Sequence, residues 1–158
     1  MSDFQELLND EIPCLMRYAS ALVREPEAAI DLVEDTVREA LAQGCAGAPG
    51  TELRVWLLRI LHEQRDNPFR RGGFAAPSAA RNPAANPSLS RFDRALAQLP
   101  EEQRAVILLI GLEAMSYDKT ASILGISVGA MRSRLLRGRD SLRQSMATPA
   151  RRRAREAA

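Results

Sequence analysis

The stretch VGAMRSRLLRGR, residues 128–139, holds the side chains best suited to a chemical task, because guanidinium groups bond phosphate oxygens and guanine edges in pairs. At 100° of rotation per helical residue, Met131, Leu135 and Leu142 form an apolar stripe that predicts the core side. The remaining surface carries small residues between arginines: Gly129, Ala130, Arg132, Ser133, Arg134 and Arg137. Small residues let a helix approach base edges while flanking arginines reach phosphates, so these six predict contact with the DNA major groove.

The segment before this helix predicts the turn of a helix-turn-helix unit. Ser116 is suited to cap one helix, Gly125 to end it in the left-handed conformation, and Ser127 to cap the next. We expect four helices in this part of the chain, at about 89–98, 101–113, 117–124 and 128–145. The last two form the unit, and the second of them enters the groove.

Side chains for catalysis or metal binding are sparse in the sequence. His62 is the only histidine, which excludes a metal site with two histidine ligands. Cys14 and Cys45 lack the CxxC spacing, and the chain has no phosphate-binding glycine loop and no nucleophile paired with a base. We therefore predict no enzyme activity, no cofactor, no metal and no small-molecule substrate.

The elements that position these residues are helices in two blocks. Apolar residues recur at intervals of three and four over residues 12–23 and 27–42, and again from Thr51 until Pro68 ends the pattern. Glycine and proline interrupt residues 72–86, which have no apolar stripe. The sequence predicts an all-α protein with helical domains at 1–71 and 89–146 and a flexible linker at 72–88. The basic tail 147–158 has no apolar face, and we expect it to be disordered.

Acidic and basic residues are distributed unevenly along the chain. Residues 1–50 carry ten acidic and three basic residues, whereas residues 101–158 carry six acidic and eleven basic ones. An acidic start indicates a protein partner with a basic surface, and a basic end indicates a polyanion. The sequence has no run of about 20 apolar residues and no signal peptide at its start, so we expect a cytoplasmic protein without membrane insertion.

Both blocks resemble a known family. Residues 96–143, LAQLPEEQRAVILLIGLEAMSYDKTASILGISVGAMRSRLLRGRDSLR, resemble region 4 of the extracytoplasmic-function sigma factors. Residues 13–41 are similar to their region 2 helices, and residues 53–71, LRVWLLRILHEQRDNPFRR, to the segment that engages the promoter −10 element. The order of the two regions and the linker also match the family.

The resemblance implies a subunit that binds core RNA polymerase and promoter DNA, with residues 129–137 on the −35 element. It places the following residues in the helix that docks on the polymerase: Asp31, Leu32, Val33, Asp35 and Thr36. It places another set along the −10 element: Arg59, His62, Asn67, Arg70 and Arg71. The pattern LRxWLxxILHxQ resembles the general-stress subgroup, whose members are held inactive by a small helical anti-sigma factor, so such a partner is also expected.

Both the region 2 helices and the −10 segment depart from the family pattern. Glu34 and Glu63 stand where family members often have Gln and Asn, and Pro68 shortens the −10 helix. A carboxylate near single-stranded DNA is unfavourable, and single-strand capture uses stacking surfaces that this chain mostly lacks. The −35 match is therefore the stronger of the two.

Two further hypotheses compete with that of a promoter-specificity subunit. A sigma-like decoy or adaptor would sequester an anti-sigma factor without supporting transcription. A dimeric helix-turn-helix regulator would use the first block for dimerisation and would bind a palindromic operator with half-sites about one helical turn apart.

Overall fold

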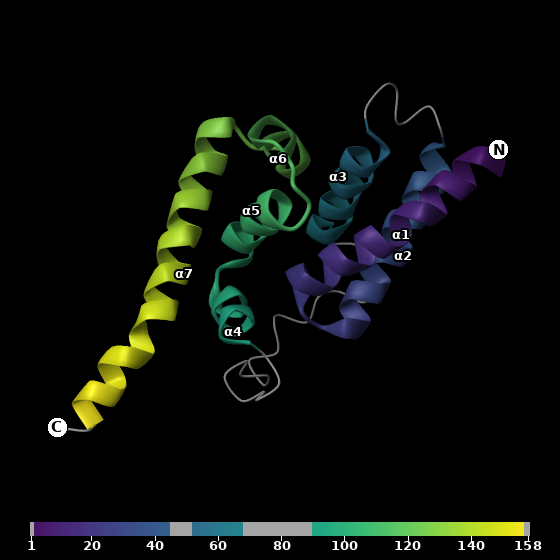
Figure 1. Ribbon diagram of the computed structural model, residues 1–158. Coiled ribbons are helices and arrows are strands. Elements are labelled where there is room, and N and C mark those ends of the chain that lie inside the picture. Colours follow the sequence, from purple (N-terminus) through teal and green to yellow (C-terminus); the bar gives the residue numbers. More distant parts are fainter. Residues whose placement is uncertain (1, 45–51, 68–89, 157–158) are drawn as a thin grey trace.

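The computed structural model describes residues 2–44, 52–67 and 90–156, with side chains for 3–44, 52–67 and 90–147 (Figure 1). These residues form seven helices and no strand: α1 Ser2–Val23, α2 Pro26–Gln43, α3 Leu53–Asp66, α4 Arg91–Gln98, α5 Glu101–Gly111, α6 Tyr117–Leu124 and α7 Val128–Glu156. The predicted all-α fold is therefore confirmed. None of the described helices is long and apolar enough to cross a membrane.

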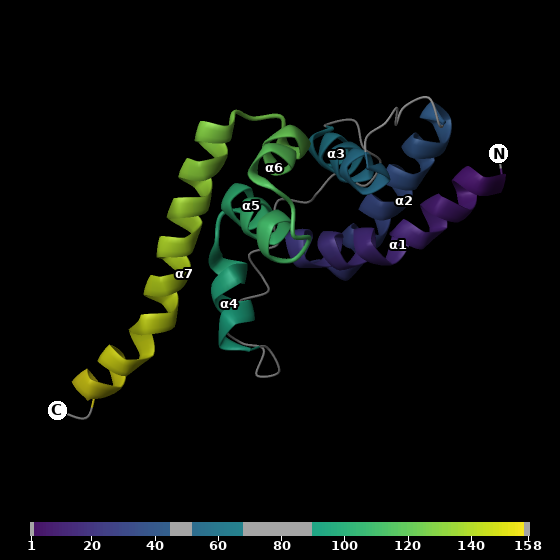
Figure 2. The ribbon, with the colours of Figure 1, turned by 45° about the horizontal axis from the view of Figure 1, so that its top comes forward.

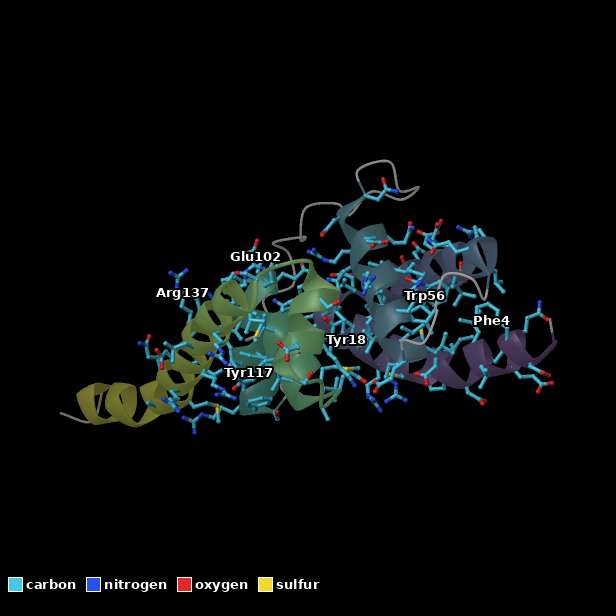
Figure 3. All side chains as sticks on the ribbon, turned by 90° about the horizontal axis from the view of Figure 1, so that it is seen from above. Phe4, Tyr18, Trp56, Glu102, Tyr117 and Arg137 are labelled. Carbon is cyan, nitrogen blue, oxygen red and sulfur yellow. The ribbon has the colours of Figure 1, made fainter. Side chains whose placement is uncertain are left out.

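The first block consists of α1, α2 and α3, which pack their apolar stripes together. Leu15 and Leu22 of α1, Leu32 of α2 and Leu57 of α3 are fully buried. At the far end, the rings of Phe4 and Trp56 lie 6.3 Å apart between centroids (Figure 3). Burial of these stripes stabilises α1–α3 because short isolated helices are marginal in water.

The second block consists of α4 to α7. Ser90 begins α4 with a capping box, in which its hydroxyl accepts from the amide of Asp93 at 3.0 Å and Asp93 bonds back to Ser90. Val106 of α5 packs with Ala121 of α6 and Met131 of α7 in a small buried cluster. This cluster fixes the two helices of the helix-turn-helix unit against α5.

Helix α7 is longer than predicted, because it continues to Glu156 rather than ending near residue 145. The expected disordered tail at 147–158 is thus corrected for residues 147–156, whose backbone is helical. Alanine, arginine and glutamate are strong helix formers, and extending an existing helix avoids the cost of nucleation. The absence of an apolar face therefore does not predict disorder in this segment.

The two blocks pack against each other, α1 on α5 and α3 on α6. Figures 1 and 2 both place α5 and α6 between α7 and the first block. One hydrophobic core contains Leu109 of α5 and Ile123 of α6 together with residues of α1–α3. The predicted linker at 72–88 lies outside the described residues.

A polar cluster, buried at Cys14 and Glu113 and open to solvent at Arg17, joins α1 to the turn after α5. The Cys14 thiol donates to Oε2 of Glu113 at 2.9 Å, and Nη2 of Arg17 lies 3.0 Å from Oε1 of the same carboxylate. The Glu113 side chain is completely buried, so its charge depends on these two partners. Burial, followed by the hydrogen bond to Glu113, raises the pKa of Cys14 to about 12. We call Cys14, Arg17 and Glu113 the interblock cluster.

Arg104 forms a second polar joint between the blocks. Its guanidinium donates to the main-chain oxygens of Leu96, Ala97 and Leu99 at the end of α4, and of Leu22 at the end of α1, the last at 2.5 Å. A cation is favourable at helix C-termini, where carbonyl groups are left unbonded. Burial lowers the pKa of Arg104, yet the four carbonyl oxygens accept from four of its five N–H donors.

Candidate nucleic-acid interface

The turn between α6 and α7 has the geometry that its sequence predicts. The Ser116 hydroxyl accepts from the amide of Lys119 at 3.2 Å and caps α6. Gly125 ends α6 in the left-handed conformation, with φ 63° and ψ 34°. The Ser127 hydroxyl accepts from the amide of Ala130 at 3.1 Å and caps α7. The three predicted capping residues are confirmed.

Helix α7 divides into a buried and an exposed side. Met131, Leu135 and Leu142 are buried, as the predicted apolar stripe requires. Five of the six predicted DNA-contacting residues are exposed: Gly129, Ala130, Arg132, Ser133 and Arg137. Arg137 projects away from the body of the protein (Figure 3). The sixth, Arg134, is half-buried, and its Nη2 lies 3.7 Å from Oε2 of Glu102 on α5.

Leu136 belongs to the same surface but was missed in the sequence. It is 62% exposed, the highest value among the large hydrophobic residues that the structure describes as exposed. At 100° of rotation per residue, Leu136 falls between Arg132 and Ser133, so helical rotation alone predicts that it is exposed on this side of α7. We call Gly129, Ala130, Arg132, Ser133, Leu136 and Arg137 the α7 face.

The α7 face combines small residues, cations and one apolar side chain. Gly129 has open space around it, since a Cβ built there meets no atom within 4 Å. The guanidinium carbon of Arg132 lies 5.6 Å from the centroid of the Tyr117 ring on α6. Such a surface can bond phosphates through arginine, base edges through arginine and serine, and a thymine methyl group through leucine.

The predicted −10 residues are not gathered on one free surface. Nη2 of Arg59 donates to the Ser122 hydroxyl of α6 at 3.1 Å, and Asn67 is exposed at the end of α3. His62 is 8% exposed, and its Nε2 lies 2.8 Å from the Tyr18 hydroxyl. Arg70 and Arg71 lie outside the described residues. The prediction for His62 is therefore corrected: it faces the interior, because its ring fills the space beside Tyr18.

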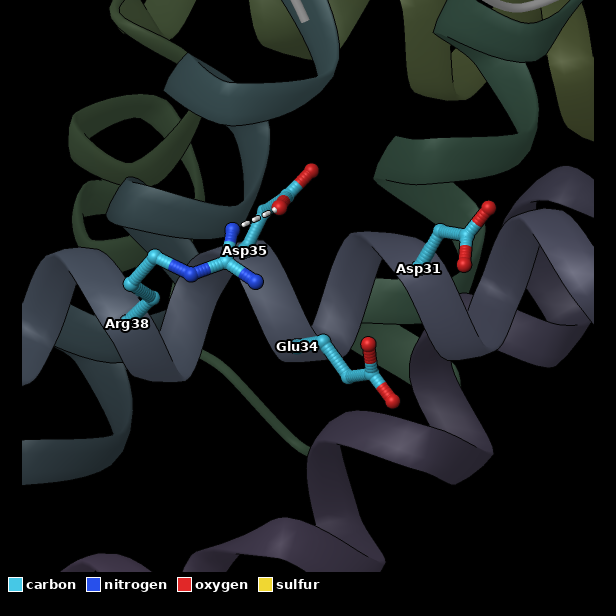
Figure 4. A pocket seen from close by; sticks show the side chains of 4 residues that line it. All are labelled: Asp31, Glu34, Asp35 and Arg38. Atoms are coloured by element: carbon cyan, nitrogen blue, oxygen red, sulfur yellow. Dashed lines mark hydrogen bonds and ion pairs between the residues drawn. The ribbon is translucent and has the colours of Figure 1, made fainter. Parts of the chain in front are cut away.

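Helix α2 presents a separate, acidic surface (Figure 4). Asp31 and Glu34 are exposed, and Asp35 is half-buried with an ion pair of 2.6 Å to Arg38. Of the residues predicted to dock on a partner, three point into the core and are corrected: Leu32, Val33 and Thr36. Thr36 bonds the main-chain oxygen of Leu32 at 2.7 Å. At 100° per residue, Leu32, Val33 and Thr36 fall on the side of α2 that faces the core.

Exposed apolar residues accompany the acids of α2. Ile30 and Leu41 have about half of their surface in solvent, and neither was predicted as a contact residue. Their spacing in the helix brings them to the same side as Glu34. We call Ile30, Asp31, Glu34, Asp35 and Leu41 the α2 face. It suits a protein partner that offers both basic groups and an apolar patch.

Comparison with known proteins covers both blocks. Residues 89–142 match the family "Sigma-70, region 4", and residues 8–62 match "Sigma2 domain of PhyR". The ECF RNA polymerase sigma factor EcfG of Rhodopseudomonas palustris is 32% identical over 141 residues, which cover 83% of this chain and 78% of that protein. This chain belongs to the ECF RNA polymerase sigma factors.

Other relatives agree with this assignment. The sigma factor CarQ of Myxococcus xanthus is 30% identical over 89% of this sigma factor and 87% of its own length. The sigma factor RpoE of Bartonella quintana, solved with the anti-sigma factor NepR, superposes with a TM-score of 0.76 at 31% identity. That match covers 94% of this chain and 99% of RpoE. CnrH, solved with the cytosolic domain of CnrY, gives a TM-score of 0.69 at 28% identity, with 92% and 88% covered.

In this sigma factor the region 4 block covers part of α3, the helix predicted to engage the −10 element. Helix α6 packs on α3, where Arg59 meets Ser122, and Nζ of Lys119 pairs with Glu52 at 2.5 Å. Arg65 of α3 pairs with Glu101 of α5. The α7 face and the α2 face stay exposed on the same molecule. The arrangement therefore leaves the α7 face and the α2 face exposed, while the side of α3 that carries Arg59 is in contact with α6.

Proposed function

We propose that this sigma factor directs core RNA polymerase to promoters by placing the α7 face in the major groove of the −35 element. The observation that supports this proposal is the exposure of that face on the second helix of a correctly capped helix-turn-helix unit. The groove admits an α-helix, and the N-terminal residues of the second helix contact base edges in such units.

Each side chain of the α7 face has a chemical role in this proposal. Arg137 and Ser133 lie near the middle of the face and bond base edges, Arg137 in the bidentate manner that favours guanine. Leu136 contacts the methyl group of a thymine. Arg132 on one flank and Arg134 on the other reach the phosphates of the groove walls, and the free amides at the start of α7 add to the attraction for phosphate.

The α2 face is the docking surface for core polymerase in the same proposal. Its exposed carboxylates, Asp31 and Glu34, suit a basic partner surface, and Ile30 and Leu41 add apolar area. The corrected residues Leu32, Val33 and Thr36 hold the face in place from the inside. The excess of acidic residues over 1–50 favours a long-range approach to a basic surface.

We place the −10 contact at the end of α3 and in the residues that follow it. Asn67 is exposed there, and Arg59 becomes available when it leaves Ser122. Arg70 and Arg71 continue the sequence with two further cations. Glu63 is exposed on the same helix and opposes the approach of DNA, so the −10 contact is weaker than the −35 contact.

Control by an anti-sigma factor is part of the proposal. Two relatives with similar folds were solved with such a partner or with a partner domain: RpoE with the anti-sigma factor NepR, and CnrH with the cytosolic domain of CnrY. The similarity of this chain to both over nine-tenths of its length supports the same type of control. The protein then acts where RNA polymerase acts, in the cytoplasm.

Run-off transcription tests the proposal. Core polymerase is combined with the full chain and a pool of promoter fragments, and transcripts are sequenced to find start sites and the shared −35 element. We expect defined starts that are lost with Asp31→Arg/Glu34→Arg, which reverses the charge of the α2 face. A holoenzyme that initiates nowhere would favour the sigma-like decoy. Binding to a palindrome without polymerase would favour the dimeric regulator.

A further inference from the structure

The contact between Tyr117 and Arg132 joins the two helices of the helix-turn-helix unit at its exposed surface. Tyr117 is the first residue of α6, and Arg132 lies one turn into α7. The guanidinium carbon is 5.6 Å from the centroid of the ring, within the range of a cation–π interaction. The ring is partly exposed, 38% by area, so its outer edge and the arginine share one surface.

The backbone around Tyr117 is held in place by local structure. The Ser116 hydroxyl caps α6 immediately before the ring, and Gly125 and Ser127 fix the turn that carries α7. The ring therefore has a defined position relative to Arg132. An arginine side chain carries much rotamer entropy, and a partner that restricts it beforehand lowers the cost of ordering it on DNA.

A ring positions arginine differently from a carboxylate. A guanidinium that lies over a ring bonds no oxygen acceptor there, so its five N–H donors stay free for phosphate or base acceptors. Arg134, on the opposite flank of α7, lies near Glu102, whose carboxylate competes with phosphate for the same donors. Of these two flanking arginines, Arg132 is the one that is oriented and still fully able to donate.

We propose that Tyr117 is a positioning residue for −35 recognition, whose ring holds the Arg132 guanidinium in the orientation that it adopts on DNA. This inference rests on the proposed −35 function of the α7 face and adds a residue of α6 to it. Tyr117 acts through Arg132, so its effect requires that arginine. The aromatic ring carries the effect, and the hydroxyl does not.

A double-mutant cycle in the full chain tests the inference. Dissociation constants are measured by fluorescence anisotropy at fixed salt for a −35 duplex selected from a random pool and for a scrambled duplex. We expect Tyr117→Leu to weaken binding of the selected duplex about three- to five-fold, the range of an exposed cation–π contact. We expect Tyr117→Phe to restore binding to within two-fold. In an Arg132→Ala background, Tyr117→Leu has no further effect.

Controls separate this role from a structural one. Phe92→Leu removes an exposed aromatic ring from α4, outside the α7 face, and leaves both dissociation constants unchanged. Thermal unfolding of Tyr117→Leu stays close to wild type, which excludes loss of the fold as the cause of weaker binding.

Three results would overturn the inference. Equal losses in Tyr117→Phe and Tyr117→Leu would assign the effect to the hydroxyl. Additive losses in the double variant would show that Tyr117 acts independently of Arg132. A full effect of Arg137→Ala with none of Arg132→Ala would leave the −35 function intact and remove both Arg132 and Tyr117 from it. If no substitution on the α7 face changes binding, the proposed function itself fails.

Discussion

Arg137 differs from Arg132 and Arg134, the two other arginines of α7 that are predicted to contact DNA, because it has no partner among the described residues. Arg132 lies over the ring of Tyr117 and Arg134 lies near Glu102, whereas Arg137 has no hydrogen bond or ion pair within the part of the chain that the structure describes. Its donors are available for a base, and it lies one turn beyond Ser133 on the exposed side. Substitution of Arg137 therefore removes the proposed DNA contact without disturbing a contact inside the described part of the protein.

We predict that Arg137→Ala weakens binding to the selected −35 duplex by about 1–3 kcal/mol, because a bidentate base contact is lost. Binding to scrambled duplex changes far less, since that binding rests on phosphates. Titration of both duplexes by anisotropy checks this. Arg143→Ala, which removes an exposed charge further along α7, is the matched control and should preserve the preference. Equal losses on both duplexes would contradict base recognition by Arg137.

His62 gives the fold a dependence on pH. Burial, followed by the nearby charge of Arg65, lowers the pKa of His62 to about 4 from an ordinary value of 6.5. The folded state therefore keeps the ring neutral at pH values where the unfolded chain binds a proton. As the pH falls below 6.5, proton binding favours the unfolded state, and the loss of stability is complete near pH 4.

We predict that the wild-type chain loses up to about 3 kcal/mol through this residue between pH 6.5 and pH 4. His62→Gln keeps a polar partner for Tyr18 and removes the titration. Urea unfolding of both proteins across this range checks the prediction, because the difference between the two curves cancels the contribution of carboxyl groups. Parallel curves would mean that His62 is open to protons in the folded state.

At the scale of elements, the crossing of α5 and α7 depends on a glycine. A Cβ built at Gly138 would lie 2.7 Å from Cδ1 of Ile107 and 3.4 Å from Cβ of Gln103. The glycine thus allows a close approach, and a larger residue there requires at least the Ile107 side chain to shift. This crossing matters for DNA binding because α5 supports α7 from behind the α7 face.

We predict that Gly138→Ala is less stable than Gly129→Ala by about 1–2 kcal/mol. Both changes improve helix propensity, but only the methyl group at 138 meets neighbouring atoms. The same substitution in the same helix therefore isolates the packing cost. Urea unfolding midpoints measure the difference. Equal midpoints would show that the end of the Ile107 side chain moves aside at no cost.

Some features of the helices are determined by residues close together in the sequence, and others are not. Ser116, Gly125 and Ser127 determine their caps through their own side chains or backbone freedom, so the turn could be predicted. The end of α7 could not, since the helix continues without an apolar face to indicate it. Leu136 was predictable from helical rotation but was overlooked, because leucine is normally assigned to a core. Leu32, Val33 and Thr36 were misplaced because a family resemblance identifies a helix without identifying its exposed side.

At the scale of the whole molecule, local sequence patterns could not predict that the two blocks pack against each other. Arg17 and Glu113 are 96 residues apart, and no spacing rule connects them. A charged residue also normally predicts a surface position, whereas the Glu113 side chain is fully buried. Since α6 packs on α3, the proposed contact of Arg59 with the −10 element requires the blocks to separate.

The interblock cluster provides a chemical reporter of that separation. Alkylation requires the thiolate, and the raised pKa of Cys14 together with its burial keeps the thiolate scarce while the blocks are in contact. Withdrawal of Glu113 removes the hydrogen bond and the repulsion between the carboxylate and a thiolate. In a Cys45→Ser background Cys14 is the only cysteine of the chain, so its alkylation follows the separation of the blocks.

We predict that core polymerase with promoter DNA accelerates alkylation of Cys14 by iodoacetamide at pH 8 by at least ten-fold, because thiolate formation and access both increase. Mass spectrometry of the peptide that ends at Arg17 measures the rate. Glu113→Gln accelerates the reaction without polymerase, since it removes the negative charge beside the thiol and the ion pair with Arg17. Glu39→Gln, the same change at a half-buried residue of α2 that accepts from Gln43, does not. An unchanged rate in the holoenzyme would show that the blocks stay in contact there. The −10 element would then have to be bound while the side of α3 that faces α6 stays covered.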